Sequence, residues 1–436
     1  MSSVQPGTHK LLTVLGLTFG IAVAVGNTIG AGILRSPGTI AEHLPEFWPF
    51  MAVWVVGGLY ALLGTNAVAE LATMLPRSGG QYVFVRHGLG DYPGFIVGWS
   101  DWLSTCGTTA AVAIVLGEYM VGLFPELRTH QVVALLVVGI LTAIQWAGVR
   151  WGGGAQTATS LIKGVVLILF IAACFVLGNR NPAASVLVED REGSLLIAFI
   201  LSLQAVIYTY DGWTAPVYFS EEIREPGKVI PRAMFGGLFA VMAIYILINV
   251  GFAAVVPIPT LAGKNLAVGA VAQTLFGYHG DTVVRGLMVL ALLSTVNSSI
   301  LMAPRVIFAM ASDRLFWRHA TQVNRGGTPD VALMISTVVA AIFIVSGTFE
   351  EVIGKLAFFF VANYALSFTS LFVLRRRAPD APRPWRAWGH PWTTGLALLG
   401  SVAFMLAAIG ADPRNSLWAV GLLFLSYPAY LLIKRN

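Results

Sequence analysis

Two short segments interrupt apolar stretches of the chain with residues that weaken a helix. The first, Gly26–Gly32, reads GNTIGAG, and the second, Tyr208–Pro216, reads YTYDGWTAP. A glycine inside a helix costs about 1 kcal/mol relative to alanine, and a proline costs about 3 kcal/mol. The sequence therefore predicts a broken helix at both places.

A broken helix inside a membrane has chemistry of its own. Hydrocarbon cannot satisfy the freed amide and carbonyl groups, so each break must line a polar cavity. The amides that begin the following helix suit a carboxylate, and the carbonyls that end the preceding helix suit an ammonium group or another cation. Interrupted segments at corresponding positions of two halves are typical of a transporter site. The alternative is that the glycines only permit close helix packing.

Composition indicates the elements that position these segments. The 436 residues are 56% hydrophobic and 11% charged, whereas a soluble domain carries about 25% charged residues. The chain is therefore predicted to be an all-α membrane protein forming one domain over 1–436. Apolar runs of about 20 residues or more predict twelve transmembrane helices. These are 11–41, 47–75, 92–124, 131–150, 156–178, 194–221, 231–256, 282–311, 330–347, 350–374, 392–411 and 415–433.

The distribution of positive charge predicts the orientation. Roughly two thirds of the 27 Lys and Arg residues fall on the side that holds both termini, and basic residues mark the cytoplasmic side. We therefore expect a multi-pass protein of the cytoplasmic membrane with both termini in the cytoplasm. Because the basic residues sit at helix ends, the net charge of +6 does not indicate nucleic-acid binding.

Several motifs together resemble the amino acid–polyamine–organocation superfamily, and within it the prokaryotic members of the L-type amino acid transporter group. They are residues 26–33, Pro76–Tyr82, Tyr210–Trp213, Glu221–Pro226, and Arg305 with Phe308–Asp313. The resemblance implies the leucine-transporter-like fold, in which helices 1 and 6 are discontinuous. Two inverted repeats of five helices would cover 11–178 and 194–376, and helices 11 and 12 would cover 392–433.

The resemblance also implies a substrate site at the two breaks. Backbone of the first break would hold a substrate carboxylate, and the second break would hold the α-amino group, with Tyr208 as the outer gate. Asp211 departs from the small residue that is common in the animal members of the group. The predicted substrate-binding residues are Thr28, Ile29, Gly30, Ala31, Gly32, Tyr208, Thr209, Asp211 and Gly212.

Charged residues within spans are candidates for function, because burying them in a membrane is costly. Lys163 matches, in the resemblance, a lysine whose ammonium takes the place of a sodium ion. It would contact a carbonyl near Gly26 and a polar group of Asn297 or Ser298; the alternative is that it reaches to the cytoplasmic surface. Asp211 would accept the substrate ammonium, move protons or cap the outgoing helix.

These features predict a secondary transporter of small or neutral L-amino acids that works by alternating access, with sodium-independent exchange or proton coupling. A polyamine or other organic-cation carrier is the alternative that Asp211 favours, and a channel is a more distant one. No metal-ligand spacing, cofactor motif or nucleophilic triad is present, so neither a metal, a cofactor nor an enzyme is predicted. Since no cysteine lies in a predicted outer loop, no disulfide-linked partner subunit is expected.

Overall fold

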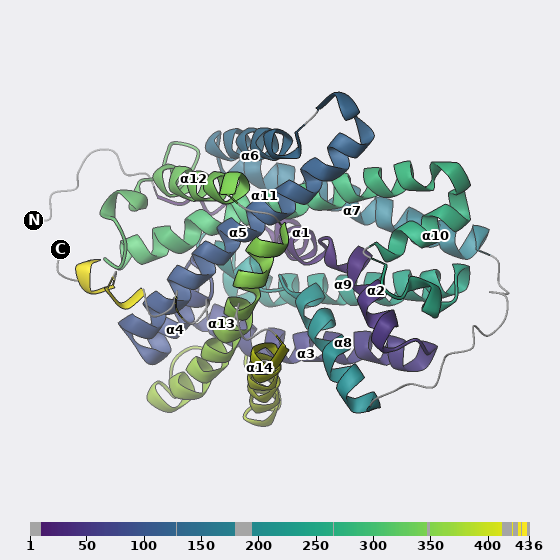
Figure 1. Cartoon of the computed structure of the whole chain (residues 1–436). Coiled ribbons are helices and arrows are strands. Elements are labelled where there is room, and N and C mark those ends of the chain that lie inside the picture. Colours follow the sequence, from purple (N-terminus) through teal and green to yellow (C-terminus); the bar gives the residue numbers. More distant parts are fainter. Residues whose placement is uncertain are drawn as a thin grey trace, which may run out of the picture.

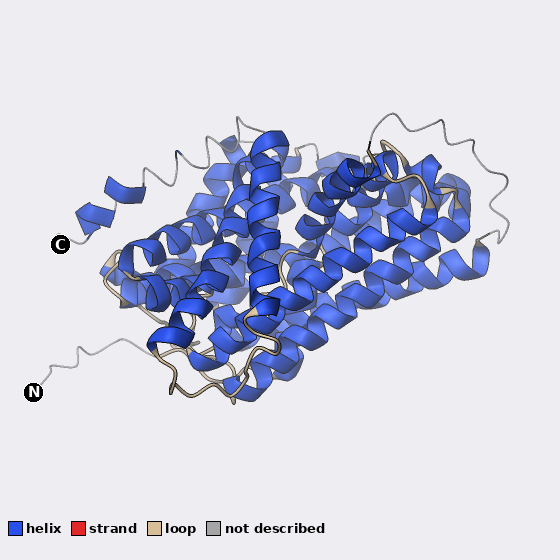
Figure 2. Ribbon diagram, turned by 90° about the horizontal axis from the view of Figure 1, so that it is seen from below, coloured by secondary structure: helices blue, strands red, loops and turns tan. Residues whose placement is uncertain are grey.

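The computed structural model is a bundle of helices (Figure 1). It describes residues 10–127, 129–178, 194–264, 266–346, 349–411, 421, 426–428 and 430–433. Within these ranges no residue belongs to a strand, and Figure 2 shows only helices and the loops that join them. One isolated bridge pairs Leu15 with Ile223. The all-helical class predicted from the composition is confirmed for this part of the chain.

Several of the long helices lie roughly parallel to one another, and others cross them (Figure 2). The helices of 17 residues or more are α3 (Phe47–Met74), α5 (Asp91–Leu123), α6 (His130–Trp146), α7 (Val149–Leu177), α9 (Pro226–Val255), α11 (Gly280–Ser312), α12 (Asp330–Ser346), α13 (Phe349–Arg377) and α14 (Trp392–Ala411). The shorter α-helices are α1 (Leu17–Thr28), α2 (Gly32–His43), α4 (Gln81–Leu89), α8 (Leu195–Tyr210) and α10 (Ala267–Phe276). The 3₁₀ helices are η1 (Pro125–Leu127), η2 (Ala215–Phe219), η3 (Ile258–Leu261), η4 (Gly277–His279) and η5 (Arg318–Thr321).

The outer surface of the bundle is apolar. On α7, for example, Val165, Leu169 and Val176 are 56%, 64% and 79% exposed, which suits hydrocarbon. Among the described residues, six helical segments are long and apolar enough to span a membrane, and the α1–α2 pair adds a seventh if it forms one span. The protein is therefore a multi-pass membrane protein. The count of twelve spans stays a prediction, since the last span, 415–433, lies largely outside the described residues.

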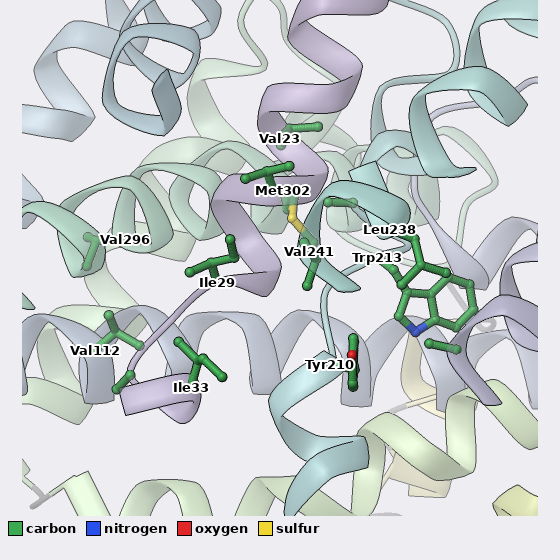
Figure 3. Packing of buried hydrophobic residues seen from close by; sticks show 14 of the residues in the cluster. Val23, Ile29, Ile33, Val112, Tyr210, Trp213, Leu238, Val241, Val296 and Met302 are labelled. Atoms are coloured by element: carbon green, nitrogen blue, oxygen red, sulfur yellow. The ribbon is translucent and has the colours of Figure 1, made fainter. Parts of the chain in front are cut away.

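Helix ends fall at both interrupted segments. α1 ends at Thr28, and α2 begins at Gly32 with its axis bent by 42° from that of α1. Figure 3 shows the ribbon leaving α1 beside Ile29 and resuming as a helix at Ile33. α8 ends at Tyr210, four turn residues follow, and η2 then continues the same apolar segment.

The two interrupted segments touch each other through glycines. Gly212 has a φ of +113°, which favours glycine, and a Cβ there would lie 2.9 Å from the amide nitrogen of Thr28. A Cβ on Gly32 would lie 3.1 Å from the hydroxyl of Thr209. The lack of side chains at these positions therefore lets the end of α1 and the end of α8 meet inside the bundle.

The turn that follows η2 is bonded to three other parts of the bundle. The Ser78 hydroxyl accepts a bond from the Glu221 amide, and the Leu15 amide donates to the Glu222 carbonyl. The Glu222 carboxylate receives two bonds from Arg305 of α11, at 2.6 and 2.7 Å. Both side chains of this ion pair are at most 1% exposed, and the guanidinium lies 4.5 Å from the centre of the Phe219 ring.

Replacing Arg305 with Met is expected to lower the free energy of unfolding by about 3–5 kcal/mol, because it leaves a buried carboxylate without its partner. The double variant Arg305→Met/Glu222→Leu removes both charges and should recover part of that loss. The measurement is the thermal unfolding of the purified protein in detergent micelles.

A matched control is Asp281→Asn, which breaks the exposed pair of Asp281 with Arg285. An exposed pair contributes about 1 kcal/mol or less, so this variant should unfold near the wild-type temperature. If the Arg305 variant also unfolds there, the buried pair does not stabilise the bundle.

Candidate functional site

A cavity of about 240 Å³ lies between the two interrupted segments. This is smaller than the roughly 300–1,000 Å³ of sites for drug-sized ligands, so it favours a small ligand. Its walls come from α1, α2, α4, α5, α8, α11 and α13 and from the residues around η2. The lining residues are Asn27, Thr28, Gly30, Ala31, Gly32, Arg35, Ser36, Gln81, Asp101, Thr105, Thr108, Val112, Tyr208, Thr209, Asp211, Gly212, Thr214, Tyr218, Thr295, Ser299, Met302, Phe360 and Tyr364.

Eight of the nine residues predicted to bind substrate line this cavity, and Ile29 does not. The Ile29 side chain is fully buried among apolar neighbours (Figure 3). Its carbonyl, moreover, accepts a hydrogen bond from Lys163. Ile29 is therefore the one predicted residue that does not line the cavity, and a role for its backbone in substrate binding stays a prediction.

At the first break, the backbone carbonyls are hydrogen-bonded within the protein, whereas three of the backbone amides that follow have no backbone partner in the described part of the chain. The carbonyls of Gly26, Thr28 and Ile29 already accept hydrogen bonds from protein side chains. In contrast, no backbone bond of the described residues uses the amides of Ala31, Gly32 and Ile33. These amides begin α2, where a helix has unsatisfied donors and a positive dipole end. The open side of this break therefore suits an anionic group such as a carboxylate.

Lys163 donates hydrogen bonds to two of the backbone carbonyls at the first break. Its Nζ donates to the carbonyls of Gly26 and Ile29, at 2.8 and 2.5 Å, and to the Thr295 hydroxyl at 3.1 Å. The residue is 1% exposed, so it does not reach to the surface. An ammonium surrounded by carbonyl and hydroxyl oxygens occupies the kind of position that a metal cation would take.

The polar contact of Lys163 on α11 differs from the one predicted. It is Thr295, not Asn297 or Ser298. Asn297 donates instead to Gln156 of α7 at 2.9 Å and accepts a bond from Gln145 of α6 at 3.0 Å. Ser298 donates to the side chain of Asn27 at 3.0 Å. Both therefore hold helices together around the break without touching the ammonium, because successive residues of a helix point in different directions.

Tyr245 of α9 bridges the two breaks, and the sequence alone gave no sign of it. Its hydroxyl lies 2.9 Å from the carbonyl oxygen of Thr28 and 2.9 Å from that of Thr209. The residue is fully buried. A buried carbonyl without a partner is costly. The one proton of this hydroxyl is shared between the ends of α1 and α8, and the Thr28 carbonyl also accepts the Gly30 amide.

Two carboxylates face the cavity, and a tyrosine donates to each. The Asp211 carboxylate, in the second break, accepts a bond from the Tyr364 hydroxyl of α13. The Asp101 carboxylate of α5 accepts the hydroxyl of Tyr218, which lies 2.9 Å from both of its oxygens. Tyr218 belongs to η2, so Asp101 ties the segment after the second break to α5. Asp211 bonds across to α13.

Comparisons with known proteins agree with a transport site. A family model described as amino acid permease matches residues 10–429. The serine/threonine exchanger SteT of Bacillus subtilis (strain 168) is 27% identical over 431 residues, which cover 97% of each chain. The human b(0,+)-type amino acid transporter 1 is 28% identical over 88% of this chain and 80% of its own. The human Asc-type amino acid transporter 1 is 26% identical over 85% of this chain and 73% of its own.

Replacing Tyr245 with Phe is expected to lower the free energy of unfolding by about 1–3 kcal/mol, because at least one buried carbonyl loses its donor. Thermal unfolding in detergent measures this loss.

Tyr210→Phe is the matched control. The ring of Tyr210 lies 4.9 Å from that of Tyr245, and its buried hydroxyl has no hydrogen-bond partner among the described residues. Removing that hydroxyl should leave stability unchanged or slightly raised. Equal losses in both variants would mean that the bridge between the breaks adds nothing to stability.

Proposed function

The chain belongs to the amino acid permease family, and on that premise we propose that it is a secondary transporter of small or neutral L-amino acids that works by alternating access. The observation that carries the proposal is the polarity of the cavity. Free amides at the start of α2 face it from one side, and Asp211 faces it from the end of α8. A zwitterion presents a carboxylate to the first group and an ammonium to the second.

The size and lining of the cavity support a small substrate. Thr105, Thr108, Thr214 and Ser299 add hydroxyl groups to a cavity of about 240 Å³. Hydroxyl groups can bond a polar side chain or the charged ends of an amino acid. The printed name of the bacterial relative, a serine/threonine exchanger, supports the same class. We propose Tyr208, which lines the cavity, as its outer gate.

The proposal includes the finer architecture that the resemblance implies. Twelve spans form two inverted repeats at 11–178 and 194–376, followed by helices 11 and 12 at 392–433. In this arrangement helices 1 and 6 are discontinuous, and the bend between α1 and α2 supports the first of these breaks. Both termini lie in the cytoplasm, and the membrane is the cytoplasmic membrane. Binding at helix breaks in the middle of the membrane is typical of such repeats.

Lys163 is the proposed coupling residue. Its ammonium holds the carbonyls of Gly26 and Ile29, where a sodium ion would otherwise supply the positive charge. We therefore propose transport that does not depend on sodium, either by exchange of one amino acid for another or by coupling to protons. Asn297 and Ser298 support this centre by joining α11 to its neighbours.

A polyamine or other organic-cation carrier is the second candidate. Asp211 and Asp101 place two carboxylates at the cavity, which a ligand with several amines would need. The free amides of α2 argue against it, because such a ligand has no carboxylate. The broken helices do not favour a channel. The names of the matching family and of the bacterial relative, permease and exchanger, support transport and not catalysis.

No covalent partner subunit is proposed. Both cysteines of the chain, Cys106 and Cys174, are buried within α5 and α7.

The transport proposal predicts uptake of labelled serine or threonine into proteoliposomes preloaded with the same amino acid. Uptake should be unchanged when sodium is replaced by N-methylglucamine, because Lys163 supplies the cation of the first break. Uptake without preloading, under an inward proton gradient, distinguishes proton coupling from exchange. Uptake that requires sodium would remove the proposed role of Lys163.

Ligand-induced thermal stabilisation separates the two candidates. Serine should stabilise the protein, whereas serine methyl ester and putrescine should not, because both lack the carboxylate that the α2 amides bind. Asp211→Asn should weaken serine binding by about ten-fold or more, the loss expected for a hydrogen bond to a charged group. Stabilisation by putrescine and not by serine would favour the organic-cation carrier.

A further inference from the structure

A second cavity lies on the outside of the bundle, away from the substrate site. It is a groove of about 570 Å³ between the first turns of α9, residue Leu62 of α3, and the connection that joins α13 to α14. Its lining shares no residue with the cavity between the breaks. The transport proposal does not use this groove.

Four aromatic side chains line the groove. Phe235 and Phe239 come from α9, and Trp385 and Trp388 come from the connection. The rings of Phe235 and Trp385 pack with their centres 5.0 Å apart. Phe239 and Trp388 remain 53% and 45% exposed, although both are large apolar groups. Tryptophan is enriched where a membrane meets water, so this wall suits the boundary between hydrocarbon and headgroups.

Two basic side chains also line the groove. Lys228 and Arg232 line the groove, lie one turn apart on α9 and are both exposed. Like charges at this spacing repel each other by a few tenths of a kcal/mol. None of the described residues that line the groove is acidic. The nearest charge partner is Glu225, whose carboxylate lies 2.9 Å from the Lys228 ammonium at the edge of the site.

We propose that this groove binds one acidic phospholipid from the leaflet that borders the start of α9. Its phosphate and anionic headgroup contact Lys228 and Arg232, and an acyl chain lies along Phe235 and Phe239. The order of these groups supports a lipid in particular. Both cations precede both phenylalanines on a helix that is long and apolar enough to span the membrane, so charge and hydrocarbon contacts follow each other with depth. A soluble phosphate would contact only the two cations, Lys228 and Arg232.

The far wall of the groove is held firmly enough to serve as a binding surface. The Ala387 amide donates to the Glu70 carboxylate of α3 at 2.7 Å, and Arg375 of α13 donates to the same carboxylate at 2.9 Å. Asn66 of α3 donates to the Trp388 carbonyl at 2.9 Å. A lipid lodged between α9 and this connection therefore braces α9 against α3 and should stabilise the folded protein.

The test is thermal unfolding of the purified full chain in detergent with added phosphatidylglycerol or with phosphatidylcholine of the same acyl chains. Phosphatidylglycerol should raise the unfolding temperature, and phosphatidylcholine should raise it much less. In the variant Lys228→Gln/Arg232→Gln, half-maximal stabilisation should need more phosphatidylglycerol, by about five-fold for each cation removed. Equal stabilisation of the wild type by both lipids would overturn the proposal.

Two further variants separate lipid binding from general effects of charge or folding. Arg150→Gln/Arg318→Gln removes two exposed cations on α7 and η5 that do not line the groove, and it should respond to phosphatidylglycerol as the wild type does. Glu225→Gln frees Lys228 from its partner and should lower the amount of phosphatidylglycerol needed. The proposed lipid site would be contradicted if the control variant lost as much response to phosphatidylglycerol as the groove variant. It would also be contradicted if the Glu225 variant needed more phosphatidylglycerol than the wild type.

A soluble anion is tested separately. Inorganic phosphate, added without lipid, should not shift the unfolding temperature in a way that depends on Lys228 and Arg232. A shift as large as that caused by phosphatidylglycerol would show that the groove recognises phosphate alone and would overturn the assignment to a lipid.

Discussion

The structure depends on satisfying the backbone groups that are freed where α1 and α8 end inside the bundle. Water is scarce there, so each carbonyl needs a donor from the protein. The Lys163 ammonium serves Gly26 and Ile29, and the Tyr245 hydroxyl serves Thr28 and Thr209. The amides at the start of α2 receive no such partner from the backbone. The same arrangement that stabilises the fold therefore leaves one kind of polar group free for a ligand.

The positions of the helix ends could be predicted from residue types, because a helix is interrupted by the residues at the interruption itself. Gly26, Gly30 and Gly32 weaken one helix, and the Asp211-Gly212 pair ends another, so the helix ends fall where the sequence placed the interruptions. Lys163 was identifiable because a charge in an apolar run needs a reason. The buried contact with Gly26 followed from the resemblance.

The partners of these groups were harder to predict, because they depend on how each helix is rotated. A change of two or three positions on α11 turns a side chain by a large part of a circle, which is why the ammonium meets Thr295 and not Asn297 or Ser298. Tyr245 and Tyr364 sit in apolar runs and have no sequence feature that separates them from residues of the core. Only the packing of α9 and α13 against the breaks gives them their roles.

Under the proposed alternating access, we expect η2 and the turn after it to separate from their neighbours when this end of the bundle opens. Two polar contacts hold η2 and this turn to their neighbours, one between Tyr218 and Asp101 and one between Ser78 and Glu221. The bond between the Ser78 hydroxyl and the Glu221 amide contributes about 1 kcal/mol net, and the bond to the Asp101 carboxylate about 1.5–3 kcal/mol, because water replaces each when it breaks. The Glu222–Arg305 pair is different, because separating it would leave two buried charges; we therefore expect α11 and this turn to move together.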